Sequence, residues 1–309
     1  MDQQKTILVT GATGAQGNGV AFALLRSGLY RVRCLTRNAS SDKAIALQKA
    51  GAEIVEGNLD DPQSIDHAVK DCYGVFGVTN FWEHYENEFR HGRNLVEAVA
   101  RAGVEHFVFS TLPDYNRLSN FRLPVPHCDI KAELENYTRL LGIRASFVHI
   151  AFYYENFLSF FPPRLGDDGC YHFGFPQGDT PLAMASVEDM GEIVAAIFRD
   201  PAAYAGRTVG VVGEDSPCGE YAATMSRVLG QPVRYTYIPK EVFSAFDFPG
   251  AEELANMFEV QRLHIPGRRH HLEESYRMNP SMQSFESWLV SNREKFSFLS
   301  KKTVEAPAI

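Results

Sequence analysis

The chain has 309 residues and carries 30 Lys and Arg against 38 Asp and Glu, a formal net charge of −8. Hydrophobic residues make up 45% and charged residues 22%, which suits a globular protein with a sizeable core, and the length favours two domains. The acidic balance argues against a broad surface for nucleic acid or membrane, because such surfaces need excess positive charge. It leaves room for a local basic pocket that binds a small phosphorylated ligand.

The five cysteines are scattered and never form a CxxC pair, which argues against a disulfide framework and against structural zinc. The polar first residues lead directly into a strand-like run, so the pattern predicts no signal peptide. Apolar runs stay well below the roughly 20 residues needed to span a bilayer. His84, His91 and His172 lack a metal-ligand spacing. We therefore expect a cytoplasmic protein without a metal site.

The first half of the chain alternates between strand and helix patterns. Strands are predicted at residues 5–10, 31–36, 53–56, 73–78, 106–110 and 145–150, and helices at 17–27, 41–50, 62–70, 86–102 and 128–141. Short connections between these segments indicate βαβ units, which form parallel sheets covered on both faces. We expect an α/β fold with a Rossmann-type, doubly wound parallel sheet.

The regular alternation ends near residue 151. We predict a nucleotide-binding domain at residues 1–151 and a smaller, mostly helical C-terminal lobe at 152–309. Ser186, followed by Asp189, is predicted to cap a helix that runs to residue 198. A strand predicted at 208–212 could return to the sheet of the first domain. Further elements are predicted at 218–229, 234–237, 240–246, 251–258 and 281–296.

A glycine-rich loop follows the first predicted strand and opens the first helix. Its residues are Gly11, Ala12, Thr13, Gly14, Ala15, Gln16 and Gly17. Glycines at this spacing allow a tight turn, close approach of a pyrophosphate to the backbone, and close packing of helix on strand. Amides at the start of the helix would then face the phosphates. A plain βα turn is the alternative, but the βαβ context favours dinucleotide binding.

The end of the second strand favours NADP(H) over NAD. An NAD site usually has an acid here for the ribose 2′-hydroxyl, whereas this chain has Arg37 and no acid until Asp42. Arg37 can fork onto a 2′-phosphate, with a solvated loop arginine as the alternative. Asn58, after the third strand, is expected to bind the adenine. The cofactor should cross the sheet edge where the fourth strand ends, at 78–81.

Several motifs together resemble the NmrA-like family, an atypical branch of the short-chain dehydrogenases/reductases. These motifs are GATGAQG, TRN after the second strand, VTNFWE (78–83), HCDIK (127–131), FYYEN (152–156) and FPGAEELANMF (248–258). The resemblance runs from about residue 5 to about residue 298 and is greatest to the NADPH-sensor subgroup. It implies a Rossmann-type NADP(H) domain and a smaller lobe that together form a cleft.

The resemblance also implies which residues contact the cofactor. These are Gly11, Ala12, Thr13, Gly14, Ala15, Gln16, Arg37, Asn58, Thr79, Asn80, Phe81 and Lys131, with Tyr153, Tyr154, Glu155 and Asn156 near the nicotinamide. Arg90 stands where the sensor subgroup has a lysine. Arginine keeps the positive charge but changes the geometry of the contact.

The catalytic pattern departs from that of an ordinary short-chain dehydrogenase. Such enzymes use Tyr-x-x-x-Lys, in which the tyrosine exchanges a proton with the substrate, together with a serine near the end of the fifth strand. Here Lys131 is present, His127 replaces the tyrosine, and Ser110 or Thr111 could act as the serine. If the protein is an enzyme, Lys131, His127 and Ser110 are the catalytic candidates.

Two functions remain open at this stage. The loss of the tyrosine is typical of the sensor relatives, so the leading hypothesis is a regulator that responds to the NADPH/NADP⁺ ratio through its conformation or a protein partner. The alternative is an NADPH-dependent reductase of a flat acceptor such as a quinone or imine, with the proton supplied by His127, Lys131 or water. An aromatic wall would suit this acceptor, although several of its rings could instead belong to the core: Phe81, Trp82, Tyr153, Tyr154, Phe157, Phe160 and Phe161. Direct nucleic-acid or membrane binding is not expected, and a homodimer is left open.

Overall fold

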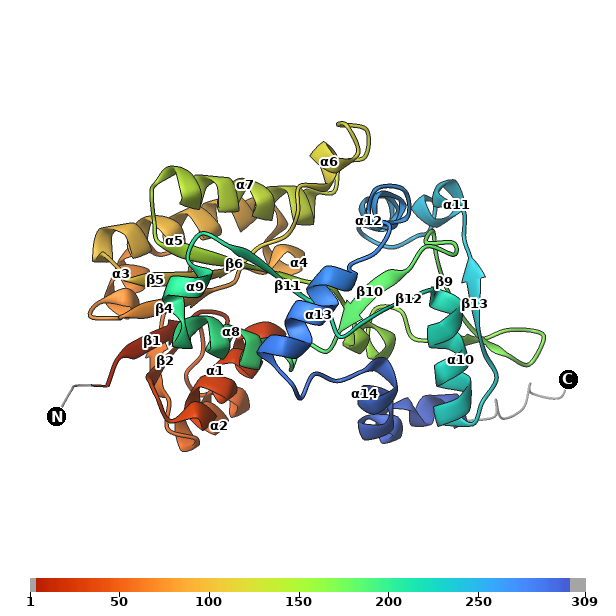
Figure 1. The fold of residues 1–309 in the computed structure, drawn as a ribbon, viewed down its shortest axis with the longest axis horizontal. Coiled ribbons are helices and arrows are strands. Elements are labelled where there is room, and N and C mark those ends of the chain that lie inside the picture. Colours follow the sequence, from red (N-terminus) through yellow and green to blue (C-terminus); the bar gives the residue numbers. More distant parts are fainter. Residues whose placement is uncertain (1–3, 301–309) are drawn as a thin grey trace, which may run out of the picture.

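The computed structural model describes residues 4–300. Its centre is a parallel sheet of seven strands in the order β11-β6-β5-β4-β1-β2-β3 (Figure 1). The strands are β1 (Thr6–Val9), β2 (Arg31–Thr36), β3 (Glu53–Glu56), β4 (Gly74–Gly77), β5 (His106–Ser110), β6 (Ala145–Ile150) and β11 (Thr208–Val211). This strand order, with helical crossovers between the strands, confirms the predicted Rossmann-type α/β fold.

Helices cover both faces of the sheet because successive side chains of a strand point to opposite faces. Ile7 and Val9 of β1 pack with α1 (Ala15–Ser27), α2 (Asp42–Lys49) and α8 (Met190–Arg199). Leu8, between them, packs on the other face. The helices of that face are α3 (Pro62–Val69), α5 (Glu88–Ala102) and α7 (Pro126–Leu140).

The strand predicted at 208–212 is β11, which pairs in parallel with β6 at one edge of the sheet. Helix α8 precedes it, packs against α1, and is followed by the short α9 (Pro201–Tyr204). Segments beyond residue 151 therefore complete the seven-stranded layer. The domain division near residue 151 stays a prediction.

The predicted start of the helix at Ser186 is wrong. Helix α8 begins at Met190, after a turn, with Asp189 at the N-cap position. The Ser186 hydroxyl donates to Oε1 of Glu155 at 2.8 Å. The same oxygen accepts the amide of Glu188 at 3.3 Å, so the side chain serves a turn and a tertiary contact ahead of the helix.

The smaller C-terminal region contains two three-stranded sheets as well as helices. One sheet has the order β12-β10-β7 and the other the order β13-β9-β8. Their strands are β7 (Phe152–Tyr153), β8 (Arg164–Leu165), β9 (Tyr171–Phe175), β10 (Leu182–Ala185), β12 (Glu214–Ser216) and β13 (Val233–Tyr237). The segment predicted at 234–237 within a mostly helical lobe is therefore the strand β13.

The helices of this region enclose an aromatic core. They are α10 (Cys218–Leu229), α11 (Lys240–Ser244), α12 (Ala251–His264) and α14 (Phe285–Ser291), with 3-10 turns at Tyr154–Leu158 and Arg293–Ser300. Helix α13 (Arg269–Met278) instead packs against β11 and α8. Phe175 and Phe258 stack with ring centroids 4.5 Å apart, and Trp288 is buried nearby in the same cluster. Offset and edge-to-face rings of this kind stabilise a core beyond their buried area.

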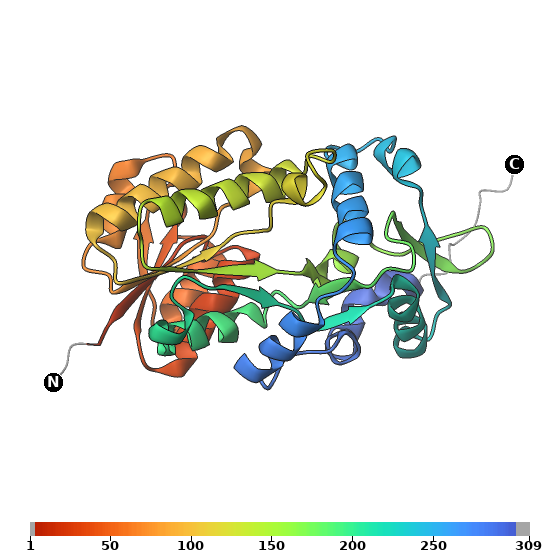
Figure 2. The same cartoon turned by 45° about the horizontal axis from the view of Figure 1, so that its top comes forward.

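The carboxyl ends of the sheet strands point toward the smaller region (Figures 1 and 2). The connections at this edge carry α4 (Phe81–His84), a 3-10 turn at Tyr85–Asn87, and α6 (Tyr115–Leu118). Ligands of open α/β sheets bind at such edges. Among residues 4–300, no helix is long and apolar enough to cross a membrane.

Candidate functional site

The glycine-rich loop forms a tight turn between β1 and α1. Gly11 has φ +58°, and a Cβ at Gly17 would lie 2.3 Å from the Gly11 carbonyl oxygen, so side chains are excluded there. Helix α1 begins after Gly14, and no side chain caps its first amides. These amides and the helix dipole favour an anion at this point.

A pocket of about 280 Å³ lies between this loop and the start of α2. It is lined by Thr13, Thr36, Arg37, Asn38, Ser41, Asp42 and Lys43. The ammonium of Lys43 donates to the Thr13 carbonyl at 3.1 Å, which holds a second cation beside Arg37. The pocket therefore combines two cations with hydroxyl groups, a set that suits a phosphate.

Arg37 pairs with α4 across the sheet edge. Its Nη1 lies 2.6 Å from Oε1 of Glu83 and 3.2 Å from Nε2 of His84. The hydrogen bond from Arg37 lowers the pKa of Glu83. Asn80 donates to the other Glu83 oxygen at 3.0 Å. Because the Arg37 side chain is 54% exposed, the pair contributes little to stability and leaves the guanidinium within reach of a ligand.

Asn58 and Arg90 meet at the acidic loop after β3. Oδ1 of Asn58 accepts the amide of Asp60 at 3.1 Å, so this part of its side chain shapes the loop. Oδ1 of Asp60 lies 2.6 Å from Arg90 and 2.8 Å from the buried His91. The close contact with His91, followed by the charges of both neighbours, lowers the pKa of Asp60. Arg90 is 52% exposed and paired much as Arg37 is, so its contact with the cofactor stays a prediction.

Gln16 and Tyr153 join the glycine-rich loop to the segment after β6. Nε2 of Gln16 donates to the Tyr153 hydroxyl at 2.6 Å, and burial raises the pKa of Tyr153. Oε1 of Gln16 is buried without a hydrogen-bond partner in the described residues. An orphaned acceptor, a side-chain-free cradle and a pocket with two cations together fit a dinucleotide that carries a 2′-phosphate.

The residues after Tyr153 are placed less favourably for a cofactor. Tyr154 is fully buried in the aromatic core, and its hydroxyl donates to the Gln283 carbonyl at 3.3 Å. Glu155 accepts a bond from Nε1 of Trp288 at 3.1 Å and ties the 3-10 turn after β7 to α14. Asn156 offers its backbone carbonyl to the local 3-10 turn. In the described residues, the hydrogen bond between Gln16 and Tyr153 is the one side-chain hydrogen bond from this segment to the glycine-rich loop.

Lys131 belongs to a buried polar cluster with Thr79 and Glu88. Its ammonium pairs with Oε1 of Glu88 and donates to the Thr79 hydroxyl at 2.8 Å, and that hydroxyl donates to the same Glu88 oxygen at 2.6 Å. Glu88 is fully buried, and its Oε2 has no partner in residues 4–300. The cluster lies where β4 ends, at the edge where a cofactor is expected. Within it, the Lys131 ammonium is bound to the Glu88 carboxylate.

The two candidates for the catalytic serine differ in their surroundings. Thr111 donates to Oε2 of Glu135 at 2.7 Å, and Glu135 also meets His149 at 2.9 Å. Burial opposes ionisation of Glu135, but these bonds and Arg139 outweigh it and lower its pKa to about 2. Ser110 is buried at the end of β5, and its hydroxyl has no hydrogen bond in the described residues. Ser110 is therefore the more available hydroxyl.

His127 meets a carboxylate from the smaller region. Its Nδ1 and its backbone amide both lie 2.6 Å from Oε1 of Glu253, on α12. Both side chains are 11% exposed. The imidazole lies beside Phe81 and Trp82, with centroids 5.8 and 5.3 Å away. Trp82 is 48% exposed and rests on Gly250, where a Cβ would lie 2.9 Å from the indole.

Three residues were missed by the sequence analysis. Lys43 comes a few residues after Arg37, and this nearness in the sequence to a predicted phosphate site could have indicated a second cation. Glu88 and Glu253 lie 43 and 126 positions from their partners Lys131 and His127, so no local pattern marks them. Among residues 4–300, no group of three His, Cys, Asp or Glu side chains is placed to hold a metal ion.

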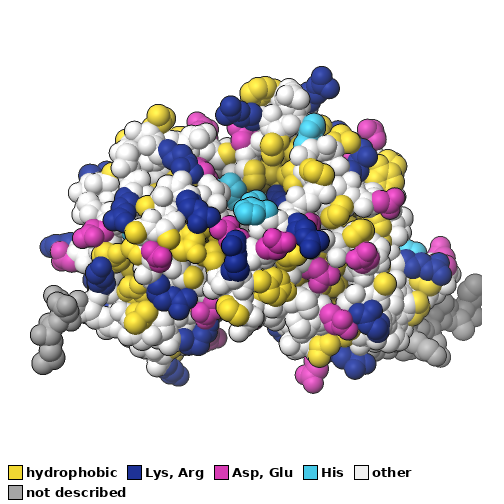
Figure 3. Space-filling view, viewed as in Figure 1, with side chains coloured by type: hydrophobic (Ala, Val, Ile, Leu, Met, Phe, Trp, Pro, Cys, Tyr) yellow, Lys and Arg dark blue, Asp and Glu magenta, His cyan; other side chains and the backbone are white. Residues whose placement is uncertain are grey.

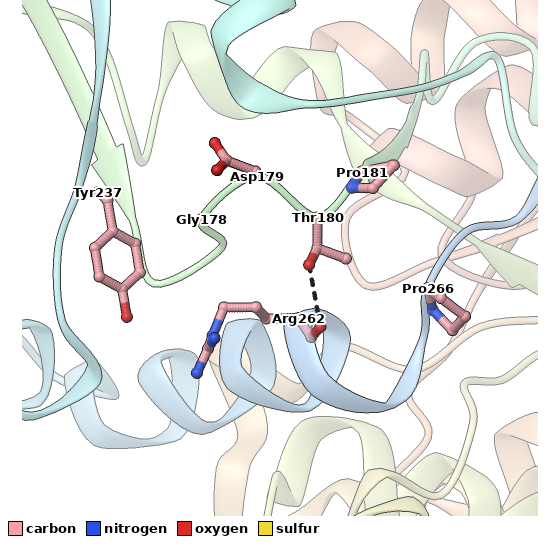
Figure 4. A pocket seen from close by; sticks show the side chains of 7 residues that line it. All are labelled: Gly178, Asp179, Thr180, Pro181, Tyr237, Arg262 and Pro266. Carbon is pink, nitrogen blue, oxygen red and sulfur yellow. Dashed lines mark hydrogen bonds between the residues drawn. The ribbon is translucent and has the colours of Figure 1, made fainter.

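A second pocket, of about 680 Å³, lies on the smaller region (Figure 4). Its walls are the loop from Gly178 to Pro181, Tyr237 of β13, Arg262 near the C-terminal end of α12, and Pro266 just after that helix. The guanidinium of Arg262 is held by both oxygens of Glu259, at 2.8 and 2.9 Å. This pairing neutralises the one arginine that lines the pocket.

Comparison with known proteins places the chain in a family. A model of the NmrA-like family matches residues 3–289. The chain belongs to the NmrA-like family. An NmrA-like family domain-containing protein of Dictyostelium discoideum is 29% identical over 295 residues, 92% of this chain and 97% of that protein. The NmrA-like family domain-containing oxidoreductase lnaB of Aspergillus flavus is 32% identical over 273 residues, 82% and 81% of the two chains.

Several solved structures share the fold of this chain. The negative transcriptional regulator NmrA superposes with a TM-score of 0.82 at 25% identity, over 96% of this chain and 97% of that one. The same regulator in complex with NADP gives a TM-score of 0.81 at 24% identity and the same coverage. An NADPH-dependent quinone oxidoreductase of Escherichia coli shares the fold, with a TM-score of 0.75 at 20% identity and coverages of 93% and 98%.

Proposed function

We propose that this NmrA-like protein is an NADP(H)-dependent oxidoreductase that reduces a flat conjugated acceptor such as a quinone or an imine. The observation that carries the proposal is the His127–Glu253 pair beside the exposed indole of Trp82. It places an imidazole, a group that can give and accept a proton, next to an aromatic surface. The name of the Aspergillus flavus relative supports this function over the sensor hypothesis.

The cofactor would be held at the sheet edge by the glycine-rich loop and the pocket beside it. The amides at the start of α1 would face the pyrophosphate, and Arg37 and Lys43 the 2′-phosphate. Gln16 and Tyr153 would contact the part of the cofactor that crosses the loop. When bound, NADPH supplies the hydride that reduces the acceptor.

His127 would deliver the proton that accompanies the hydride. A carboxylate only accepts hydrogen bonds, so Nδ1 carries the hydrogen toward Glu253, and Nε2 is left without a partner in the described residues. The negative charge of Glu253 stabilises the imidazolium, which gives its Nε2 proton to the acceptor and is reprotonated by water. Lys131 is less suited to this role because Glu88 and Thr79 hold its ammonium.

The substrate class follows from the rings around His127. Trp82 offers a half-exposed indole face, whereas Tyr154 and Phe157 of the expected aromatic wall are buried in the core. A flat acceptor could stack on Trp82 within reach of His127. Phe81 is 3% exposed and supports the imidazole from behind.

A second candidate function is sensing of the NADPH/NADP⁺ ratio. The Arg37–Glu83 pair favours it, because it connects the pocket at β2 with the helix that carries Trp82. A 2′-phosphate that engaged Arg37 would compete with Glu83 and thereby act on α4. The regulator NmrA shows that the fold also serves transcriptional control.

Turnover of NADPH with a panel of quinones and imines tests the proposal. We expect oxidation of NADPH that His127→Phe abolishes and His270→Phe, at an exposed position on α13, leaves unchanged. Binding of NADPH is measured in parallel by titration. Tight binding without turnover of any acceptor would overturn the oxidoreductase, and a difference in affinity between NADPH and NADP⁺ would then favour the sensor.

A further inference from the structure

Two oppositely charged apolar patches lie along one side of the molecule. The basic patch is Arg117, Leu118, Phe121 and Arg122, on α6 and the loop that follows it. The acidic patch is Glu241, Val242, Phe246, Asp247 and Glu252, on α11 and the start of α12. Helix α12 packs against both α6 and α11, and the three lie in a row at the upper edge of Figures 1 and 2.

The basic patch exposes large apolar side chains. Phe121 is 74% exposed and Leu118 41% exposed. Arg117 and Arg122 are exposed and form no ion pair with any residue of the described chain. At the top of Figure 3, hydrophobic side chains lie between Lys or Arg side chains on this protruding tip. Apolar surface of this kind, rimmed by charge, is typical of interaction sites.

The loop that carries Phe121 is strained but firmly held. Asn120 and Phe121 have φ values of +54° and +60°, a backbone region that costs a non-glycine residue about 1–3 kcal/mol. The amide of Phe121 donates to the Asn116 carbonyl at 2.7 Å, and the buried Ser119 hydroxyl accepts the amide of Leu123 at 3.0 Å. The surroundings thus force an exposed phenylalanine into an unfavourable conformation.

Contacts from two other helices fix the base of the same loop. Asp129, on α7, accepts the amides of Asn116 and Val125 at 2.9 and 2.7 Å. Asn256, on α12, donates to the Pro124 carbonyl at 3.1 Å. The Phe121 knob is therefore preorganised, which reduces the entropy lost when it enters a partner.

The acidic patch has the complementary character. Val242 is 51% exposed and Phe246 42% exposed. Glu241, Asp247 and Glu252 are exposed and take no part in ion pairs within residues 4–300, while Lys240 is half-buried at the start of α11. Over α11, toward the upper right of Figure 3, Asp or Glu side chains adjoin hydrophobic ones.

We propose that these two patches form a two-fold interface with a second copy of this chain. In such an interface the basic patch of one copy contacts the acidic patch of the other, and the reverse contact follows by symmetry. In each of the two equivalent contacts, the two arginines of one copy face the three carboxylates of the other. Phe121 is then covered by the exposed apolar side chains of the acidic patch. The α12 segment between the patches carries Glu253, so the interface lies next to His127.

Charge reversal in both patches gives a direct test on the whole protein. We expect the wild type to have twice the 34.6 kDa chain mass by light scattering at low salt. Arg117→Glu/Arg122→Glu makes both patches acidic, and Glu241→Lys/Asp247→Lys makes both basic, so each variant alone should be a monomer. An equimolar mixture of the two restores both contacts and should again contain dimers.

A third variant probes the knob itself. Phe121→Asn removes the apolar side chain, while asparagine tolerates the left-handed backbone better than phenylalanine. We expect it to keep the thermal stability and to raise the dimer dissociation constant about tenfold or more. Melting curves for every variant separate loss of the dimer from loss of the fold.

Other results would overturn the proposal. A wild type that is monomeric up to its solubility limit, or reversal variants that stay dimeric, excludes this interface. If the wild type is monomeric but binds poly-glutamate, and Arg117→Glu/Arg122→Glu abolishes this binding, the basic patch serves an acidic partner and not a second copy.

Discussion

Nδ1 of His127, on the first turn of α7, lies 2.6 Å from Oε1 of Glu253, on the first turn of α12. The pair joins the sheet region to the smaller region at the place where an ordinary short-chain dehydrogenase would have its tyrosine. Because Glu253 also accepts the backbone amide of His127, it fixes the imidazole through two bonds. The orientation of the ring therefore depends on how the two regions are docked.

Glu253→Gln keeps the size of this side chain but removes the charge that stabilises the imidazolium. We expect kcat with the best acceptor to fall up to about 10²-fold, the lower range for loss of proton transfer, with NADPH affinity unchanged. Steady-state kinetics and cofactor titration measure the two quantities separately. Glu105→Gln, at an exposed position, serves as the control. Unchanged kcat in Glu253→Gln would exclude a role for the pair in proton transfer.

Arg37→Ala and Lys43→Ala should each weaken NADP(H) binding and leave NAD(H) binding almost unchanged. A hydrogen bond to a charged group contributes about 1.5–3 kcal/mol, so the dissociation constant should rise roughly 10- to 150-fold. Fluorescence titration with both cofactors gives the ratio. Lys49→Ala, at the end of α2, removes an exposed lysine outside the pocket and should have no effect. Equal losses for both cofactors would place the 2′-phosphate elsewhere.

Glu88→Ala should destabilise the fold by leaving Lys131 without its buried partner. Removing one member of a buried ion pair typically costs about 3–5 kcal/mol. Urea unfolding of this variant is compared with Lys131→Met/Glu88→Leu, which removes both charges and should recover most of the loss. A Glu88→Ala variant as stable as the wild type would mean that the buried cluster contributes nothing to folding.

Folding stability should decrease below neutral pH because of His106. Burial, followed by the nearby charge of Arg144, lowers the pKa of His106 from 6.5 to about 4. Between pH 6.5 and pH 4, His106 is therefore protonated in the unfolded chain but neutral in the folded chain. The contribution of neutral His106 to the unfolding free energy is complete above pH 6.5 and is lost as the pH falls toward 4. Because of His106, the unfolding free energy should be about 2 kcal/mol lower at pH 5 than at pH 7.5.

His106→Gln isolates this contribution, because glutamine can still bond the Ser146 hydroxyl, 2.8 Å from the His106 ring. The unfolding free energy is measured at pH 7.5 and at pH 5 for both proteins. Its decrease between these pH values should be about 2 kcal/mol smaller in the variant than in the wild type. Asp189 acts in the opposite direction, since burial raises its pKa to about 6, and it is present in both proteins. An identical pH dependence in the two proteins would contradict the prediction.

Gly17→Ala should push α1 away from the turn and weaken cofactor binding. Its Cβ would lie 2.3 Å from a backbone oxygen, which a rotamer change cannot relieve. Overpacking of this kind costs about 1–3 kcal/mol of stability. Gly219→Ala, in α10 with open space around the added Cβ, should instead stabilise slightly. Thermal melting and NADPH titration of both variants make the comparison.

The sequence pattern was sufficient for the fold class, because hydrophobic period and glycine placement are local properties of the chain. The six strands of the first half and the turn at Gly11 follow from these local signals. The strand β9 also has a local signal, because its aromatic residues Tyr171, Phe173 and Phe175 alternate with half-buried residues. The surrounding Pro- and Gly-rich segment obscured this alternation. At Ser186 a local signal gave a wrong helix start, because the hydroxyl that was expected to cap the helix bonds the distant carboxylate of Glu155.

The candidate site divides in the same way. The sequence by itself predicted the glycine cradle, the phosphate role of Arg37, and the replacement of the catalytic tyrosine by His127, since each is a residue type at a fixed place in a motif. Only the tertiary structure decided the partners that set their chemistry: Glu253 for His127, Glu88 for Lys131, Glu83 for Arg37 and Asp60 for Arg90. A carboxylate changes the chemistry of a neighbouring base through distance and burial, and both are properties of the packed chain.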